Sequence, residues 1–306
     1  MRARLSILFL VVFVALDVVL VTLSMRHTGI APPAAGSSAQ TAEAPTPTAS
    51  PTTATTKQSP SSARAETFGK GPAYVAVGAD GTVLRSTRGD CGASEDPAVS
   101  VSTDRGTAFR DRQVDGLSEV LAAQVASAGT LTLVGLDGDC RVGSWSSGDA
   151  GRSWEEVSDA PAAWYLAPSP TQRAVLTPEG RRRPPCVPVS LSTLGTDVVR
   201  LLCDDGQVLG TSDDGSSWVT LGRLDGAVSI RFTTPGDGVA LAIRQQGCPA
   251  AVMETSDGGN QWTQQTCLKG DTPLAIGAAG DLGVAQVGER AVVSTDGGTT
   301  WPGANG

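Results

Sequence analysis

Histidine is almost absent from this chain of 306 residues, which has only His27. That residue precedes the folded region predicted below, so Ser–His–Asp and Cys–His catalytic groups are excluded there, because both need an imidazole to carry a proton. The six cysteines form no Cys-x-x-Cys pair, which excludes the common zinc sites. Neither a phosphate-binding loop nor a dinucleotide-binding fingerprint occurs. We therefore expect no metal and no cofactor.

Aromatic and basic residues are also scarce. Aromatic residues make up 4% of the chain, and its two tyrosines, Tyr74 and Tyr165, are expected to be packing residues. The formal net charge is −8. Nucleic-acid binding depends on Lys and Arg contacts to phosphates, so this balance argues against a nucleic-acid partner. The composition, rich in Ala, Arg and Gly and poor in Lys, is typical of a high-GC bacterium.

The N-terminal region contains one long apolar run, Leu5–Met25, interrupted by a single charge at Asp17. As a helix rising about 1.5 Å per residue it would span about 30 Å, the thickness of a bilayer core. Two arginines precede the run and one follows it, which favours an N-terminus left in the cytoplasm. We interpret residues 1–27 as an uncleaved signal anchor. The alternative is a cleaved signal peptide, which would give a secreted protein.

The segment that follows, residues 28–66, consists mainly of Ala, Pro, Thr and Ser. Such a segment has too few apolar side chains to form a core, and its prolines keep it extended. We predict that it is a disordered tether. The folded domain would then comprise residues 67–306 and lie outside the cytoplasm on a single-pass membrane protein.

Five copies of a short motif, Ser/Thr-x-Asp-x-Gly-x-x-Trp or close to it, recur in this domain. The Asp can accept hydrogen bonds from backbone N–H groups of its own turn, and the Gly suits a positive φ. The closing aromatics are 45, 64, 44 and 39 residues apart, a period typical of propellers and other repeat arrays. The Asp and the aromatic of each copy, which we interpret as structural, are Asp104 and Phe109, Asp149 and Trp154, Asp213 and Trp218, Asp257 and Trp262, and Asp296 and Trp301.

The motif resembles the Asp-box, or bacterial neuraminidase repeat, of sialidases, sortilin-type receptors, xyloglucan hydrolases and the photosystem II assembly factor. The resemblance covers roughly residues 70–301. It implies an all-β propeller of four-stranded antiparallel blades, with each motif at the turn between the third and fourth strands of a blade.

Strand-like runs around the motifs fit six blades best, with five to seven left open. One blade lacks a motif and is expected to begin with an inner hairpin formed by AAWYLAP and RAVLTPE. The last blade has little chain left for its outer strand. We expect residues Glu66–Lys70 to supply that strand and so close the ring, because closure removes exposed sheet edges.

All six cysteines lie in the predicted propeller, and an even number in an exported chain predicts three disulfides. Threading the chain through the blades places them on the face opposite the motifs. Although six cysteines allow 15 pairings, this placement favours Cys91–Cys140, Cys186–Cys203 and Cys248–Cys267.

The catalytic residues of a sialidase are not evident. Sialidases use three arginines to hold a sugar carboxylate, a Tyr–Glu nucleophile pair and an Arg-Ile-Pro motif. This sequence has no Arg-Ile-Pro, and Arg231 is the one clear arginine on a predicted inner strand. A two-carboxylate glycosidase stays open, since five glutamates are available without an evident pair: Glu119, Glu156, Glu179, Glu254 and Glu289.

The remaining candidate site is the face that carries the cysteines, whose predicted loops include the only basic run of the domain. The candidate ligand-binding residues there are Arg88, Arg181, Arg182, Arg183 and Arg244. We therefore predict a monomeric, membrane-tethered binding or assembly module for a protein or a cell-envelope glycan, without enzymatic activity. The alternative is a degenerate sialidase-like glycoside hydrolase or lyase acting on an extracellular glycan.

Overall fold

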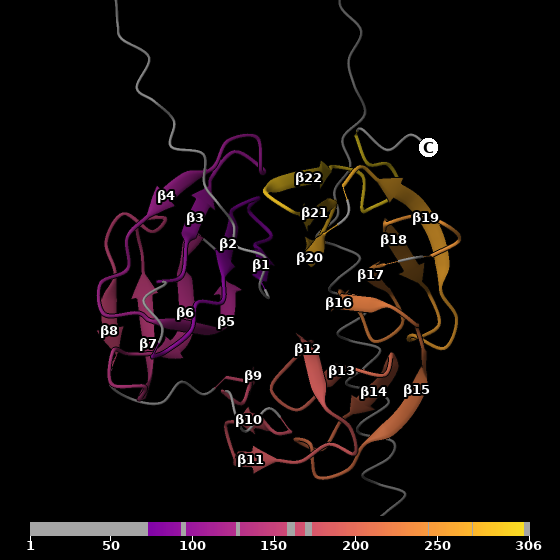
Figure 1. Cartoon of the computed structure of the whole chain (residues 1–306), viewed down its shortest axis with the longest axis horizontal. Coiled ribbons are helices and arrows are strands. Elements are labelled where there is room, and N and C mark those ends of the chain that lie inside the picture. The colour runs from indigo at the N-terminus through magenta and orange to yellow at the C-terminus, as the bar shows by residue number, and fades with distance from the viewer. Residues whose placement is uncertain are drawn as a thin grey trace, which may run out of the picture. The chain divides into compact units, whose positions relative to one another are not determined.

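A computed structural model of the chain describes residues 73–92, 96–126, 129–157, 163–168, 173–243, 245–270 and 272–302 (Figure 1). The chain divides into two units, Met1–Ser61 and Ser62–Gly306, and all described residues belong to the second. The predicted signal anchor, the tether and the strand expected at Glu66–Lys70 lie outside the described residues. Within the described ranges, no helix is long and apolar enough to cross a membrane.

The described residues form six antiparallel sheets, which are the six blades of a β-propeller. The first two blades contain β1 (Ala73–Val77), β2 (Val83–Thr87), β3 (Val99–Ser102) and β4 (Arg110–Arg112), then β5 (Glu119–Val125), β6 (Leu131–Leu136), β7 (Val142–Ser147) and β8 (Glu155–Val157). The third and fourth contain β9 (Tyr165–Leu166), β10 (Val175–Thr177) and β11 (Gly180–Arg182), then β12 (Pro188–Thr193), β13 (Val199–Cys203), β14 (Gln207–Thr211) and β15 (Val219–Arg223). The last two contain β16 (Ala227–Phe232), β17 (Gly238–Ala242), β18 (Ala250–Thr255) and β19 (Thr263–Leu268), then β20 (Pro273–Ala279), β21 (Leu282–Val287) and β22 (Arg290–Ser294).

The blades follow one another around a ring, and the yellow sixth blade lies beside the indigo first blade in Figure 1. The innermost strands β1, β5, β9, β12, β16 and β20 contact one another in that order, and β20 contacts β1. Strands within a blade differ in burial. Every residue of β17 and β21 is buried, whereas the outer strand β8 is exposed throughout. Middle strands therefore have apolar side chains on both faces, because each face packs against a neighbouring blade.

The hydrophobic core consists of six clusters, and each of them joins two consecutive blades. Leu84 and Val101 of the first blade, for example, pack with Leu131 and Trp145 of the second. The cluster that closes the ring joins Val83 of the first blade to residues of β21. Neither side of a cluster is buried without the other, so the blades depend on their neighbours for their stability.

The propeller has two faces, which we name by what they carry. Four of the five motifs form turns between the third and fourth strands of their blades, and the fifth follows β22, the third strand of the sixth blade; we call their side the motif face. The connections between second and third strands, and those between blades, lie on the other side. That side carries all six cysteines, and we call it the disulfide face.

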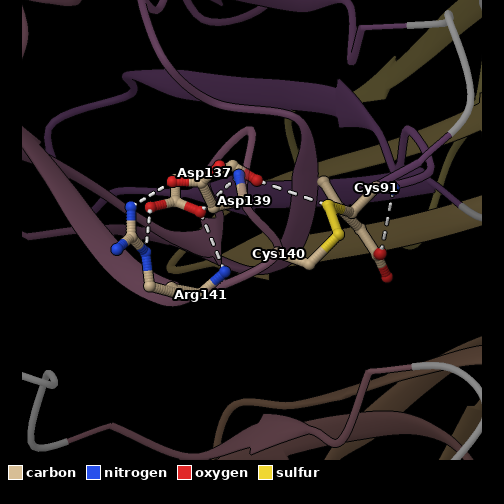
Figure 2. Close-up of a disulfide and its surroundings, with 6 residues drawn as sticks. Cys91, Asp137, Asp139, Cys140 and Arg141 are labelled. Carbon is tan, nitrogen blue, oxygen red and sulfur yellow. Dashed lines mark hydrogen bonds and ion pairs between the residues drawn. A yellow bond between two sulfur atoms is a disulfide. The ribbon is translucent and has the colours of Figure 1, made fainter.

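The structure contains three disulfides, with the pairs predicted from the sequence: Cys91–Cys140, Cys186–Cys203 and Cys248–Cys267. Cys91 follows β2 and Cys140 precedes β7, so this bond joins loops of the first and second blades (Figure 2). Beside it, the Asp137 carboxylate accepts hydrogen bonds from the backbone N–H groups of Asp139 and Arg141 at 2.9 and 2.8 Å. Figure 2 shows that this carboxylate, paired with the Arg141 side chain, organises the loop that holds Cys140.

The motif turns have one repeated hydrogen-bond pattern, illustrated here by the second copy. Ser147 Oγ donates to Asp149 Oδ1 at 2.8 Å and accepts the N–H of Gly151 at 2.9 Å. Asp149 Oδ1 accepts the N–H of Ser153 at 3.0 Å, and Gly151 adopts a φ of +78°. Hydrogen bonds from Ser153 and Ser147 hold the pKa of Asp149 well below its usual value. The motif aspartates thus stabilise their own turns.

The third blade differs from the expected inner hairpin. Its β10–β11 turn contacts the motif of the fourth blade: Thr177 Oγ1 donates to Asp214 Oδ2 at 3.1 Å. Thr177 Oγ1 also accepts the N–H of Glu179 at 3.1 Å, as the motif hydroxyls accept the N–H of their Asp. This turn is therefore a reduced motif on the motif face, and β9, β10 and β11 correspond to the second, third and fourth strands of a blade.

Candidate functional site: the central channel

A cavity of about 930 Å³ lies at the centre of the ring and is lined by residues of all six innermost strands. Its size is in the range of ligand-binding pockets. More than half of the lining residues are aliphatic, and Val75, Leu191, Val228 and Leu274 are among those with partly exposed side chains. A wall of this kind suits apolar groups of a ligand, while the few polar side chains that reach the cavity determine where charged groups can bind.

At the end of the channel near the disulfide face, Arg88 is neutralised by Glu119. The guanidinium Nε and Nη2 atoms of Arg88 both lie 2.8 Å from Glu119 Oε1. Glu119 is 4% exposed and also accepts the N–H of Cys91 at 3.4 Å. This pair joins the first and second blades next to their shared disulfide. The guanidinium of Arg88 is therefore paired within the protein and is not free to bind a ligand carboxylate.

Tyr74 lines the cavity near this ion pair. Burial raises the pKa of Tyr74 to about 12, with the nearby Arg88 charge lowering it and the Glu119 charge raising it further. Tyr165 of β9 is 7% exposed, and burial raises its pKa as well. Both phenols are thus neutral near pH 7, which suits hydrogen bonding and packing in the wall.

Arg231, the next-to-last residue of β16, is half-buried in the channel wall. Its Nε donates to the carbonyl oxygen of Ala278 in β20 at 3.3 Å, which links the fifth and sixth blades. Burial lowers the pKa of Arg231 because the charged guanidinium is partly removed from water. No carboxylate of the described residues lies within ion-pair distance of Arg231.

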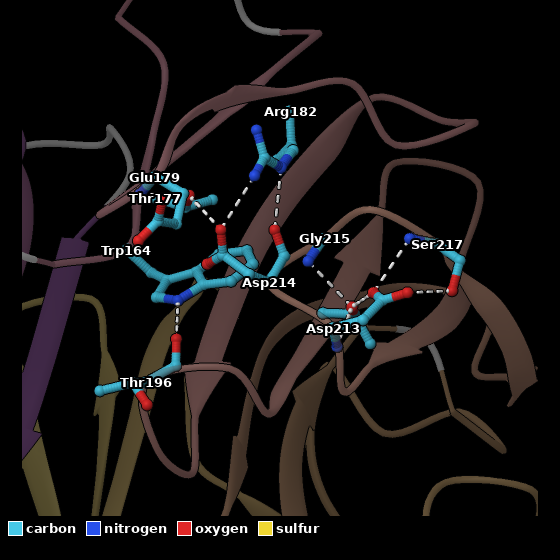
Figure 3. A network of polar contacts seen from close by, with 10 residues as sticks. Trp164, Thr177, Glu179, Arg182, Thr196, Asp213, Asp214, Gly215 and Ser217 are labelled. Carbon is cyan, nitrogen blue, oxygen red and sulfur yellow. Dashed lines mark hydrogen bonds and ion pairs between the residues drawn. The ribbon is translucent and has the colours of Figure 1, made fainter.

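The basic run Arg181–Arg183, predicted for a loop of the disulfide face, lies instead on and directly after strand β11. Arg181 and Arg182 belong to β11, and Arg183 follows it. The Nε of Arg182 donates to the carbonyl oxygen of Asp214 at 2.9 Å, and its Nη2 lies 3.0 Å from Asp214 Oδ2 (Figure 3). Arg182 therefore joins two blades at the motif face, because strand β11 starts at that face. Arg181 on β11 and Arg183 directly after it are exposed, and Arg244 lies outside the described residues.

The carboxylates do not form a catalytic pair in the channel. Asp204 is the one carboxylate among the described residues that line the cavity. Glycosidases of the two-carboxylate type need a second one about 5 to 10 Å away. Among the described residues, no group of three or more His, Cys, Asp or Glu side chains could hold a metal ion.

No protein-family model matches the sequence, and no curated protein sequence matches it significantly. Many solved structures are similar in fold, among them the following three. YCF48 from Cyanidioschyzon merolae is 10% identical over 72% of this chain and 81% of its own, with a TM-score of 0.44. A structure of YCF48 bound to a D1 peptide is 14% identical over 72% of this chain and 74% of its own, with a TM-score of 0.41. A GH74 xyloglucanase from Xanthomonas campestris is 18% identical over 74% of this chain and 37% of its own, with a TM-score of 0.32.

Proposed function

We propose that this protein is a non-enzymatic binding module that holds a segment of another protein in the central channel of its propeller. The observation that carries this proposal is the cavity of about 930 Å³, whose wall combines aliphatic side chains with polar groups, as a peptide ligand requires. An extended segment with apolar side chains fits such a wall. Only one carboxylate of the described lining is available, so no observation favours the alternative of a glycoside hydrolase.

The location of the protein is part of the same proposal. Three disulfides support an oxidising environment, since such bonds are rare in the cytosol. With residues 1–27 as a signal anchor and 28–66 as a tether, the propeller would act as a monomer at the outer side of a bacterial membrane. The hydrogen bonds of the motif turns support membership of the Asp-box type.

A test uses two matched valine substitutions in the full-length chain. Val189 of β12 is 38% exposed and lines the cavity, whereas Val219 of β15 is 63% exposed and lies outside its lining. Val189→Trp should fill the channel, and Val219→Trp should leave it open. A displayed library of random octapeptides would be selected on the immobilised wild-type protein, and the retained peptides measured on both variants by fluorescence anisotropy.

We expect binding to fall at least tenfold in Val189→Trp and to stay unchanged in Val219→Trp. Thermal unfolding of both variants checks that they fold. Failure of the wild type to retain any peptide above the empty support would overturn the proposal, as would equal binding by the two variants. A parallel array of cell-envelope glycans provides the second comparison, and saturable binding there without peptide binding would replace the protein ligand with a glycan.

A further inference from the structure

We infer that the channel selects segments that carry a carboxylate, and that the guanidinium of Arg231 binds this group near the motif face. The inference rests on the proposed function and specifies its ligand. The carboxylate can belong to an Asp or Glu side chain or to a free C-terminus, since the chemistry that Arg231 offers is the same for each.

The first step is that Arg231 has hydrogen-bonding capacity left over. An arginine has five N–H donors, and the Nε donor of Arg231 is used by the Ala278 carbonyl. Its four Nη donors remain, and their planar arrangement matches the two oxygens of a carboxylate. Removing a charge from water is costly unless the charge is paired. The half-buried position of Arg231 in the wall therefore favours an anion from outside the protein.

The second step is that neither carboxylate in or beside the cavity wall, Glu119 or Asp204, pairs with Arg231. The Glu119 carboxylate is engaged by Arg88 at 2.8 Å. Asp204 directly follows β13 and so lies at the disulfide face, whereas Arg231 is close to the motif-face end of β16. Within the described part of the wall, Arg231 is thus the one cationic group without an ionic partner, and the unpaired Asp204 lies at the other end of the channel.

The third step concerns the surroundings of Arg231. Gln124, the next-to-last residue of β5, is exposed to the same cavity at a similar height in the opposite blade of the ring. Its amide can donate a further hydrogen bond to an anion or to a peptide carbonyl. The aliphatic side chains of Val228 and Leu274, which are partly exposed, line the same cavity. Apolar side chains next to the acidic residue would contact this wall.

These surroundings favour a peptide over an acidic sugar. A uronic acid carries hydroxyl groups around its ring, and an aliphatic wall would leave them without hydrogen-bond partners at a cost in free energy. A peptide that combines one carboxylate with Val, Leu or Ile leaves fewer polar groups unpaired. The occupant that fits best is therefore an extended, largely apolar segment with one acid.

The test repeats the peptide selection on three variants of the full-length chain. Arg231→Gln removes the charge, Arg231→Lys keeps the charge without the planar donor pair, and Arg223→Gln is the control on the outer strand β15. Peptides selected by the wild type should be enriched in Asp, Glu or a free C-terminus beside aliphatic residues. Their affinity should fall about 10- to 100-fold in Arg231→Gln, less in Arg231→Lys, and not at all in Arg223→Gln.

Replacing the acid of a selected peptide by its amide should cause the same loss on the wild type and no further loss on Arg231→Gln. Selected peptides without acid enrichment, or equal affinities on the wild type and Arg231→Gln, would overturn the inference while leaving peptide binding in place. Absence of any retained peptide on the wild type would instead overturn the proposed function. Binding of a glucuronate oligosaccharide in preference to every acidic peptide would also contradict the inference.

Discussion

At the scale of single residues, the first motif shows how the structure accommodates a phenylalanine at the position where the other four motifs have a tryptophan. Its aromatic is Phe109, whereas Trp154, Trp262 and Trp301 each donate an indole N–H to the Gly carbonyl of their own motif. Phe109 has no such donor. The guanidinium of Arg85 lies 4.0 Å from the centre of its ring, and Arg85 Nε donates to Ser100 Oγ at 2.7 Å. A cation–π contact thus holds the Phe109 ring, whereas an indole hydrogen bond holds Trp154, Trp262 and Trp301.

A prediction at this scale concerns Asp213 and pH. Hydrogen bonds from Ser217 and Thr211 lower the pKa of Asp213 from 3.8 to about 2. A lowered folded-state pKa contributes stability that is present above pH 4 and is lost as pH falls toward 2. We expect Asp213→Asn to lower Tm by a few degrees at pH 7, with the difference from the wild type narrowing below about pH 4.

Thermal unfolding followed by circular dichroism between pH 7 and pH 3 measures this difference. Asp111→Asn, at an exposed position of β4, is the matched control and should follow the wild type throughout. A Tm difference for Asp213→Asn that stays constant down to pH 3 would contradict the electrostatic explanation.

At the scale of elements, the third blade departs most from a regular repeat. Its turn at Thr177–Gly180 is shorter than a motif, and the ion pair of Arg182 with Asp214 connects it to the next blade. Figure 3 shows the Trp164 indole N–H directed at the Thr196 carbonyl, a 2.7 Å hydrogen bond that adds a second connection between these blades. Contacts between blades therefore replace the local hydrogen bonds that a complete motif would supply.

The disulfides allow a prediction about elements. Cys91 and Cys140 are 49 residues apart, and Cys186 and Cys203 are 17 apart. A disulfide stabilises by restricting the unfolded chain, and more so for a longer loop. We expect the Cys91→Ala/Cys140→Ala variant to lose about 4 kcal/mol and the Cys186→Ala/Cys203→Ala variant about 3 kcal/mol of unfolding free energy.

Urea unfolding under oxidising conditions measures both losses. The wild type treated with a reductant should be less stable than either variant, because all three disulfides are then open. Unchanged stability in either variant would show that the corresponding bond does not form or does not restrict the unfolded chain.

At the scale of the whole molecule, every core cluster belongs to two blades. Leu121, which is 1% exposed, packs in the cluster that joins the second and third blades. Because no blade buries its apolar faces alone, we expect the propeller to unfold in one cooperative transition. Leu121→Ala should lower the unfolding free energy by about 2–5 kcal/mol and shift that transition as a whole.

Tryptophan fluorescence and far-ultraviolet circular dichroism, recorded on the same urea series, check this prediction, since the tryptophans lie in several blades. The two signals should coincide for the wild type and for Leu121→Ala. Separate midpoints for the two signals would mean that groups of blades unfold independently.

The repeat, five of the six blade ends, the inner position of Arg231 and the disulfide pairs could all be predicted from the amino-acid sequence. These features rest on local chemistry: a turn needs its Asp, Gly and aromatic within eight positions, and a cysteine pair follows from where its loops must lie. Which charged side chains are free to bind a ligand could not be predicted, because it depends on contacts made in the folded ring. Arg88 and Glu119 are 31 residues apart in the sequence, and Arg182 and Asp214 are 32 apart. Arg231 and Ala278 are 47 residues apart. Each contact joins neighbouring blades, and no local pattern encodes such a contact, because ring packing alone brings the two residues together.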